Sequence, residues 1–575
     1  MSVARRALRL CITRRVSRDP YTRRAVSWSA PSQRWMVYLL VALVALAVRF
    51  GFWAQIRGTP LDAWHTWEQT DMATYVEQAR RLAAGDWLAR EPYHPYHAWQ
   101  REVATEAEWL HWYAPLSFHQ APLYSYALAA LSKLRTDYLP LVKGLQLVLG
   151  AGTCLLLAHV AGRIGGLAVA AVAGGIAAIY GPLYYLEPQL LREGPAVFGS
   201  LVVLWATMRH AELPRESPLR RLAVSASLLG LLIGVYALFH ETAAVLALAV
   251  AAVVTVHAAS ADWRRPAAVV AALLAGSVMG LAPLLARNAA VGVPLWTSGS
   301  RLGINLALCN MSSAPDGGTT FAHPGPQFEQ IMDASGGATF GILREVWRGY
   351  DGERMRLFLN WAHRLRVTWA SPELPDNTSF GFYRRHSSIL RASLSFRWIF
   401  PAAAAVWATW LVGRLWRAWQ PSSRRGDETE DATAAFRLGP WLAAHAGAHW
   451  TLALYALLMT LAMSVNLPQS RYRLFVVPLF IVYTSLALVA AARLLASRRM
   501  LAAAGLCGAT AAFVAFHAWV SAPYATIEDR FADYEFASSM YRRWGDEAAA
   551  EEYLRRRIIE PSHRMHEQES FRDEE

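Results

Sequence analysis

The hydrophobic positions of this chain fall in long blocks with few charges inside them. A half-buried strand would alternate every two residues, and a surface helix would show an apolar stripe with a period of 3.6 residues. The blocks instead approach the roughly 20 apolar residues that a helix needs to cross a bilayer. Helices are expected because lipid leaves no other open-ended way to satisfy backbone polar groups. The predicted spans are residues 35–54, 139–160, 166–185, 194–208, 222–239, 242–258, 267–286, 397–413, 440–463, 474–492 and 500–520.

Polar segments divide the spans into groups. Two long interruptions cover residues 55–138 and 287–396, and a short link, 414–438, contains a charged run. The pattern predicts an all-α polytopic membrane protein of about 11 transmembrane helices with two large outer loops. Its parts are a basic cytoplasmic tail at 1–34, a transmembrane module at 35–286 that includes the first outer loop 55–138, the large outer loop 287–396, C-terminal spans within 397–520, and a charged C-terminal tail at 521–575.

The apolar stretch from Pro122 to Leu134 decides the orientation of the chain. If it does not cross, the arginine-rich loops all fall on the side of the basic N-terminus, as the positive-inside rule requires. If it crosses, the rule fails for most later loops. We therefore expect this stretch to lie along or dip into the outer leaflet, with both large loops and the C-terminal tail outside. No small-residue cleavage site follows the first block, which indicates an uncleaved anchor.

Composition removes several classes of protein. Only 17% of the 575 residues are charged, against about 25% in a soluble protein, and 54% are hydrophobic. A soluble enzyme, a disordered chain and a disulfide scaffold are excluded. The net charge of +13 comes from arginines in short loops and does not indicate nucleic-acid binding. Lys133 and Lys143 are the only lysines and neither follows glycine, so a phosphate-binding loop of an ATPase is excluded.

Ionisable residues at the ends of spans are the candidates for chemistry, because charge at membrane depth is costly and marks function. The first outer loop contains EQTDMATYVEQARRLAAGDW, with Asp71 at the start of a predicted helix. Thr70 or Asp71 could cap this helix, and Asp71 would sit at the positive end of its dipole. A plain N-cap in a loop rich in acids is the alternative.

A second acidic group follows the third span in the segment LEPQLLREGP. Glu187, Arg192 and Glu193 could bind a hydroxyl, a metal or a phosphate, or form an interfacial salt bridge. No CxxC motif exists for a metal site. His445 and His449 are four residues apart, but without a visible third ligand they are interpreted as a packed or pore-facing pair. Asn310 and Asn377 match the glycosylation sequon, a short pattern that arises often by chance.

A basic group lies at the outer end of the tenth span, in the segment QSRYRLFVVP. Two arginines on the outer side break the orientation rule. Arg471 and Arg473, with Tyr472 between them, would suit a phosphate-bearing lipid headgroup, since arginine makes bidentate phosphate contacts. Snorkelling to ordinary headgroups is the alternative. His240 and Glu241 lie at another outer span end and could line the same cavity.

Five segments, taken in this order, resemble the glycosyltransferase-C superfamily. The resemblance is closest to the bacterial transferases grouped with protein O-mannosyltransferases and the aminoarabinose transferases of lipid A. Each motif is weak alone, but five in order over roughly residues 35–495 form a strong joint signal. They are DMATYVEQARRLAAGDW, FHQAPLYSYALAAL, HVAGRIGGLAVAAVAGGIAAIYGPLYYLEPQLLRE, RNAAVGVPLWTSGSRLGINLALCN and SRYRLFVVPLF.

The resemblance implies an inverting transferase that takes a sugar from a polyprenyl-phosphate donor on the non-cytoplasmic face of the plasma (inner) membrane. Asp71 resembles the acid that acts as general base on the acceptor, and Glu193 matches the second acidic position. The acceptor would be a glycan, a lipid or a protein, and no cofactor is implied with certainty. The residues assigned to substrate and lipid-phosphate binding are Arg471, Arg473, Tyr472, Glu187, Arg192, His240, Glu241 and Arg287.

The chain departs from the family pattern at two places. His240 and Glu241 stand where the family often has Arg-Pro near the outer end of the fifth span. Asp71 is followed by Met72, so the first loop has no Asp-Glu pair, and a divalent metal is possible but unsupported.

Two other functions are compatible with a polytopic membrane protein of this kind. A lipid or solute transporter or flippase would predict an internal repeat with helices broken at midplane, and no convincing repeat is visible. An O-antigen-ligase-like enzyme would place its chemistry in loop 287–396 and make Asp71 dispensable.

Overall fold

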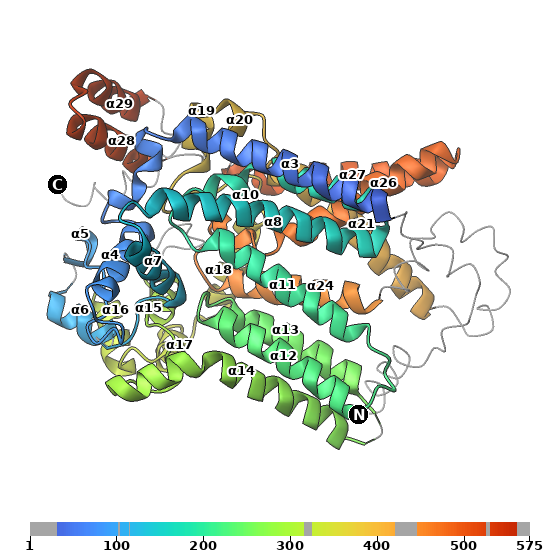
Figure 1. Ribbon diagram of the computed structural model, residues 1–575, viewed down its shortest axis with the longest axis horizontal. Helices are drawn as coiled ribbons and strands as arrows, with labels where there is room; N and C mark the ends of the chain where they lie inside the picture. The colour runs from blue at the N-terminus through green and yellow to red at the C-terminus, as the bar shows by residue number, and fades with distance from the viewer. Residues whose placement is uncertain are drawn as a thin grey trace.

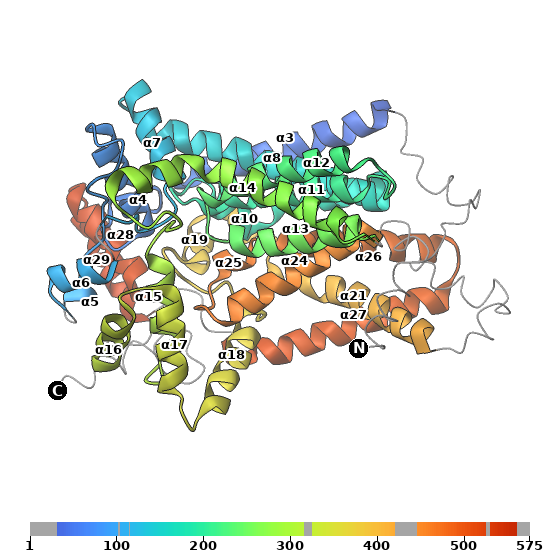
Figure 2. The ribbon, with the colours of Figure 1, turned by 90° about the horizontal axis from the view of Figure 1, so that it is seen from below.

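The computed structural model describes residues 31–101, 104–113, 116–260, 262–314, 325–419, 446–524 and 530–559. Within these ranges the regular secondary structure is helical, and turns and loops connect the helices. One isolated β-bridge joins Tyr180 and Leu394. Long helices lie side by side, and shorter helices gather at one end of the bundle (Figures 1 and 2). Most of the basic tail, most of the charged link, His445 and the last part of the C-terminal tail lie outside the described residues.

Each predicted span coincides with helical structure over its described residues, and 440–445 lie outside them. Seven of the described helices are long and apolar enough to cross a membrane, and α9 and α13 are shorter apolar helices. The count of eleven crossings stays a prediction. The helices are α3 (Pro31–Ile56), α8 (Leu139–Gly165), α9 (Leu167–Ile179), α10 (Gly181–Leu186), α11 (Glu193–Ala211), α12 (Leu219–Ala237), α13 (Ala243–Ala258), α14 (Arg264–Val291), α21 (Phe396–Trp419), α24 (Ala446–Ser464), α26 (Val477–Ala496) and α27 (Met500–Ser521).

The predicted span 166–185 is not one continuous helix, which corrects the expectation. Helix α9 ends at Ile179, Tyr180 is extended, and α10 begins at Gly181 with Pro182 in its first turn. Proline has no N–H to donate and favours the start of a helix. At this break the Gly181 N–H has its hydrogen-bond acceptor outside the helix. It donates to the carbonyl of Leu394, near the end of the second polar interruption, at 2.8 Å.

Helices α12 and α14 pack backbone to backbone through glycines. A Cβ at Gly230 would collide with the carbonyl of Leu273, and one at Gly276 with the carbonyl of Ser227. Each helix has a second glycine four residues later, Gly234 on α12 and Gly280 on α14. Small residues at this spacing permit such close approach between membrane helices. The two helices therefore form a tight pair at one side of the bundle.

The polar interruptions fold into short helices at one end of the bundle (Figures 1 and 2). The stretch Pro122–Leu134 forms a helix of 12 residues, α7, which at 1.5 Å per residue is too short to cross about 30 Å of hydrocarbon. The helices at this end are η1 (Pro60–Asp62), η2 (Trp64–Thr66), α4 (Asp71–Ala83), α5 (Ala98–Arg101), α6 (Glu106–Tyr113), α7 (Leu123–Leu134), α15 (Arg301–Asn310), α16 (Pro326–Ser335), α17 (Thr339–Gly349), α18 (Arg354–Thr368), α19 (Phe380–His386), α20 (Ser388–Arg391), α25 (Ser470–Arg473), η5 (Ala522–Tyr524), α28 (Phe531–Arg543) and α29 (Glu547–Ile559).

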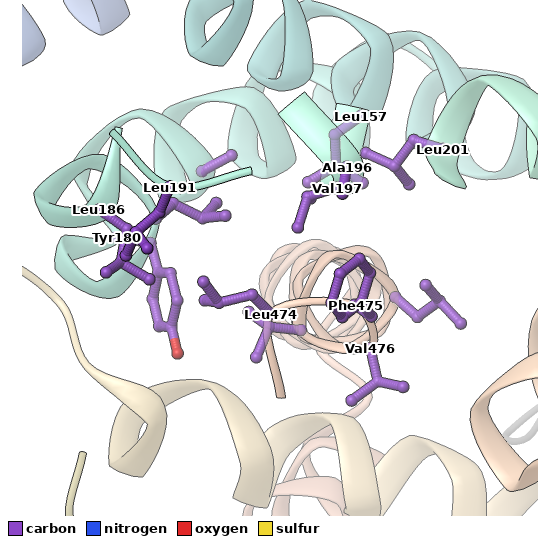
Figure 3. Close-up of a cluster of buried hydrophobic side chains, with 14 of the residues drawn as sticks. Leu157, Tyr180, Leu186, Leu191, Ala196, Val197, Leu201, Leu474, Phe475 and Val476 are labelled. Atoms are coloured by element: carbon purple, nitrogen blue, oxygen red, sulfur yellow. The ribbon is translucent and has the colours of Figure 1, made fainter. Parts of the chain in front are cut away.

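A buried apolar cluster fixes the segment that connects α25 to α26. Leu474, Phe475 and Val476 are almost completely buried. Figure 3 shows them beneath side chains of α8, α10 and α11, including Leu157 and Val197. The short helix α25, which carries the predicted arginines, is thereby anchored to the core of the bundle.

Candidate active site

Asp71 is the first residue of α4, and Thr70 is its N-cap. The Thr70 hydroxyl accepts a hydrogen bond from the Ala73 N–H at 3.2 Å, so Thr70 is the cap of the two that the sequence allowed. The Asp71 carboxylate is therefore released from capping its own helix. Only 7% of Asp71 is exposed, so its charge must be met by other parts of the chain.

Four side chains from distant segments surround the Asp71 carboxylate. Its Oδ1 accepts from Gln120 Nε2 at 2.9 Å and from the Arg301 guanidinium. Its Oδ2 accepts from Asn377 Nδ2 at 2.9 Å and from Arg471 Nη1 at 2.8 Å. Both outer loops and α25 thus converge on one carboxylate.

Arg471 lies at the centre of three carboxylates. Its Nη1 contacts Asp71 Oδ2 at 2.8 Å and Glu193 Oε1 at 3.0 Å, and its Nε contacts Asp376 Oδ2 at 2.5 Å. The Arg471 side chain is 5% exposed, so these are desolvated ion pairs. Glu193 is the first residue of α11, and its second oxygen, Oε2, is buried without a hydrogen-bond partner among the residues that the structure describes.

A cavity of about 290 Å³ opens beside this cluster. One part of its wall is charged and the other is apolar, formed by α13, α15 and α24. Such a cavity can hold a ligand with an anionic head and a hydrocarbon tail. The charged and polar lining includes Asp71, Arg192, Glu193, His240, Glu241, Arg301, Asn305, Asn466, Arg471 and Tyr472, and the apolar lining includes Val245, Leu302, Leu306, Met459 and Met463.

Arg192 and Glu241 form a separate pair at the edge of the cavity. Arg192 Nη1 donates to Glu241 Oε1 at 2.9 Å, and Nη2 contacts Oε2 at 2.6 Å. The Ala121 N–H also donates to Glu241 Oε1 at 3.0 Å. This pair ties the start of α11 and the α12–α13 turn to the first outer loop. His240 packs against the ring of Phe475 with ring centroids 4.7 Å apart.

Three predicted site residues lie outside the cavity lining. Glu187 forms a buried ion pair with Arg49 of α3, with Oε2 and Nε 2.7 Å apart. Arg473 pairs with Glu373 at 2.7 Å and does not contact Asp71. Arg287 donates to the carbonyl of Leu88 at 2.9 Å and lies over the ring of Phe118.

Seven predicted site residues line one cavity. They are Asp71, Glu193, Arg192, His240, Glu241, Arg471 and Tyr472. They come from the first outer loop, α11, the α12–α13 turn and α25. The sequence separates these elements by up to 400 residues, so their meeting is a result of the fold.

The two guanidinium groups set the acidity of Asp71. Burial alone would raise its pKa, but Arg301 and Arg471, together with the Asn377 amide, outweigh burial and hold the pKa well below its ordinary value. Burial likewise acts against the charge of Glu241, and Arg192 overcomes it and lowers the pKa of that carboxyl to about 2. Burial, followed by Arg192, lowers the pKa of His240 to about 3. Asp71 and Glu241 are therefore anionic and His240 is neutral at pH 7.

Sequence reasoning missed four residues of the cluster, which are Gln120, Arg301, Asp376 and Asn377. Arg301 opens α15 within a segment that was singled out only as a motif. Asp376 and Asn377 lie in a loop, and Asn377 drew notice only as a glycosylation sequon. The hydrogen bond from Asn377 to Asp71 joins residues that are 306 positions apart in the sequence. No local sequence pattern indicates a contact over such a separation. The only indication in the sequence was the prediction that this loop lies on the same outer side of the membrane as Asp71.

The cation at the centre of the three carboxylates is the Arg471 side chain. Within the described ranges, no group of three or more His, Cys, Asp or Glu side chains is arranged to hold a metal ion. His449, from the weaker histidine pair, shares a hydrogen bond with the Tyr483 hydroxyl at 2.9 Å.

Comparison with known proteins gives matches among solved structures alone. No protein-family model matches the sequence, and no curated protein matches it. The chain is similar to the oligosaccharyltransferase of Archaeoglobus fulgidus crystallised with Zn and sulfate, with 14% identity, a TM-score of 0.43, and coverage of 90% of this chain and 57% of that one. For the same enzyme, AglB, in complex with an inhibitory peptide and a dolichol-phosphate, the values are 14%, 0.44, 91% and 59%. This chain thus spans less than two thirds of those structures, and the functional argument rests on the side chains of its own cavity.

Proposed function

We propose that this protein is a membrane glycosyltransferase that moves a sugar from a polyprenyl-phosphate carrier to an acceptor on the non-cytoplasmic face. One observation carries the proposal. A buried carboxylate, Asp71, is held by Arg301 and Arg471 at the edge of a cavity that has an apolar part in its wall. A base, a phosphate-binding pair and a surface for hydrocarbon are thereby combined in one place.

The donor follows from the two halves of the cavity. Arg301 and Arg471 supply planar guanidinium groups, which match a phosphate geometrically and keep their charge at any working pH. Leu302, Met459 and Met463 supply apolar surface on the adjoining wall. A phosphate that carries a long isoprenoid chain satisfies both halves, whereas a nucleotide sugar would leave the apolar wall without a partner.

The chemical step is a displacement at the anomeric carbon. The acceptor oxygen attacks that carbon, the bond from carbon to the phosphate oxygen breaks, and its electron pair leaves with the polyprenyl phosphate. The acceptor proton passes to Asp71. Arg301 and Arg471 neutralise the charge that develops on the leaving phosphate. Attack opposite the leaving group inverts the anomeric configuration.

Donor binding would switch Asp71 on as a base. In the empty cavity both arginines hold its pKa well below normal, and a carboxylate so stabilised is a weak base. A bound phosphate draws the same guanidinium groups toward itself. Burial then dominates and raises the basicity of Asp71 only when the donor is present.

Glu193 and the Arg192–Glu241 pair would serve the acceptor side. Glu193 lines the cavity, and its buried Oε2 has no hydrogen-bond partner in the described part of the chain, so it would accept a hydrogen bond from a sugar or acceptor hydroxyl. The ion pair of Arg192 with Glu241 fixes the edge of the cavity on the other side of α11. We assign these residues to substrate positioning.

Loop 287–396 contributes directly to this site. It supplies Arg301, Asp376 and Asn377, which surround Asp71 and Arg471. The ligase-like alternative, with chemistry in this loop alone, makes Asp71 dispensable. Our proposal needs both loops.

The proposed donor is tested by mass spectrometry of the lipid that co-purifies with the protein. We expect a polyprenyl phosphate, with or without its sugar, on the wild-type protein and on the Asp71→Asn variant. The Arg301→Gln/Arg471→Gln variant should lose it, and the exposed Arg493→Gln variant should keep it. Equal retention by the double variant, or no polyprenyl phosphate on the wild type, overturns the proposed donor.

A further inference from the structure

A second cavity, of about 390 Å³, lies at the same end of the bundle and shares no lining residue with the reaction cavity. It is enclosed by the segment before α19, by α19 itself, by the start of α21 and by the end of α27. The lining includes Ser371, Glu373, Phe380, Arg384, Arg397, Trp398, Pro401, Val514, His517 and Ala518.

The wall of this cavity carries uncompensated positive charge. Arg384 and Arg397 line it, and neither forms an ion pair within the part of the chain that the structure describes. The one carboxylate in the lining, Glu373, is already neutralised by Arg473 at 2.7 Å and also accepts from the Phe396 N–H at 3.3 Å. Two guanidinium groups therefore face the cavity without an anion.

Apolar side chains of two outward-facing helices form another part of the lining, beside the polar Ser371, Ser395, His517 and Ser521. Trp398, which is 61% exposed, and Pro401 come from α21, and Val514 comes from α27. Helix α27 is a candidate membrane span, and only 17% of its most apolar window is buried. Tryptophan is enriched where spans meet the membrane–water interface. The cavity thus opens where lipid headgroups would lie.

We infer that this second cavity binds the phosphate headgroup of an anionic membrane phospholipid, with its acyl chains along α21 and α27. Arg384 and Arg397 contact the phosphate, and Trp398 and Val514 contact the glycerol and upper acyl region. No transfer reaction is assigned to this cavity, because Glu373, the lining carboxylate, is held by Arg473 and cannot serve as a base.

The bound lipid would brace the active site from outside. Arg473 belongs to α25, the same four-residue helix as Arg471. Its partner Glu373 lines the lipid cavity, and Asp376 and Asn377 follow three and four residues later on the same segment. A lipid that fills the cavity therefore supports the backbone that places the partners of Asp71.

Native mass spectrometry after exchange into phosphatidylglycerol, phosphatidylcholine or undecaprenyl phosphate tests the inference. The wild type should retain phosphatidylglycerol in preference to phosphatidylcholine. The Arg384→Gln/Arg397→Gln variant should retain at least about tenfold less, because two charged hydrogen-bond donors are lost. A matched control, Arg391→Gln/Arg493→Gln, removes two exposed arginines outside the cavity and should behave as the wild type.

Further arms separate this site from the reaction cavity. The Arg384→Lys/Arg397→Lys variant keeps both charges and should recover part of the retention, which shows that loss in the glutamine variant is not misfolding. Arg471→Gln should retain phosphatidylglycerol even if it loses polyprenyl phosphate. Unchanged retention by the glutamine variant, or displacement of phosphatidylglycerol by undecaprenyl phosphate in Arg471→Gln, overturns the inference.

Discussion

Arg471 and Arg473 illustrate how the site is built at the scale of single residues. They are two positions apart on α25, and residues at this spacing point to nearly opposite sides of a helix. Arg471 faces Asp71, Glu193 and Asp376, whereas Arg473 faces Glu373. The sequence predicted a basic group at this position, and the helix divides it between two environments.

Removing the central cation should destabilise the protein. In Arg471→Gln three carboxylates remain in a buried cluster without their shared partner, and losing one member of a buried ion pair costs about 3–5 kcal/mol. We expect a clearly lower midpoint of thermal unfolding in detergent. The exposed Arg493→Gln should stay within about 0.5 kcal/mol of the wild type. A midpoint equal to that of the control would contradict the arrangement of the cluster.

The acidic limb of the pH–rate profile reports the environment of Asp71. Its pKa is well below normal, and the pKa values of Glu241 and His240 are about 2 and 3. These three groups keep their charge states between about pH 5 and 8, since that window lies above all three values. We expect kcat/KM, which reports the free enzyme, to show no limb from them there.

The Arg301→Gln variant tests in which direction the acidic limb moves when the pKa of Asp71 changes. Without that guanidinium, burial is less opposed and the pKa of Asp71 rises, so the acidic limb should move to higher pH. The pH dependence of folding stability follows from the same depressed pKa. A carboxyl with a depressed folded pKa stabilises the fold above its unfolded pKa, and this stabilisation is lost as the pH falls through the folded value. An acidic limb that stays at the wild-type position in Arg301→Gln would exclude Asp71 as its source.

The sequence indicated the charged residues near the ends of spans better than the residues of loop 287–396 that contact them. Asp71 and Glu193 stood out because acids beside spans are costly. Arg301, Asp376 and Asn377 did not, because arginines and polar loop residues are common in an outer loop and only tertiary contact distinguishes them. Glu187 was grouped with Glu193 by proximity in sequence, but it is buried against α3, where Arg49 neutralises it.

At the scale of elements, the C-terminal helix α28 supports the loop that contacts Asp71. Asp533 is completely buried and accepts hydrogen bonds from the Ser379 hydroxyl and from the Arg530 N–H, the latter at 2.8 Å. Arg530 in turn donates to the carbonyl of Asn377 at 3.2 Å. Phe536 packs against Trp64 with ring centroids 4.2 Å apart. Helix α28 therefore connects both outer loops.

Asp533→Ala should disturb the site without disturbing the spans. Two buried donors lose their acceptor, at a cost of about 1–3 kcal/mol in local stability. We expect faster amide exchange at residues 376–379 and a loss of transfer of about tenfold, the factor that corresponds to about 1.4 kcal/mol. The control is Glu551→Ala on the exposed face of α29. Wild-type exchange and transfer in Asp533→Ala would show that α28 is only an appendage.

The sequence predicted helices well where a long apolar block must satisfy its backbone hydrogen bonds within the membrane. Blocks such as 267–286 have no alternative to a helix in lipid, and the structure places α14 there. The apolar pattern did not predict the break at Tyr180, although Gly181 and Pro182, which open α10, are a local signal for a helix start. The contact of Tyr180 with Leu394, more than two hundred residues later, leaves no local pattern in the sequence.

At the scale of the whole molecule, the outer loops and the C-terminal helices gather at one end of the bundle (Figures 1 and 2). The links between α8 and α9 and between α26 and α27 lie at the other end. The positive-inside rule assigns this second end, with Arg163 and Arg493 to Arg499, to the cytoplasm. The charged tail is therefore expected outside, on the side of the active site.

Cysteine labelling in intact cells or sealed vesicles tests this arrangement. In a chain without its native cysteines, Glu106→Cys and Ser539→Cys should react with an impermeant maleimide from outside. Ser497→Cys, in the link between α26 and α27, should react only after the membrane is opened. Labelling of positions 106 and 497 from the same side would reverse or abolish the proposed topology.

The central claim is that Asp71 takes the acceptor proton while the neighbouring arginines hold the carrier phosphate. The most direct measurement is sugar transfer from a defined polyprenyl-phosphate donor by purified protein in proteoliposomes. Asp71→Asn keeps the shape of the side chain but removes the base, and we predict a rate about 10²–10⁴-fold lower with the carrier lipid still bound. The exposed acid Asp137 of the same outer loop, changed to asparagine, should leave transfer intact. Transfer by Asp71→Asn at the wild-type rate would contradict the account.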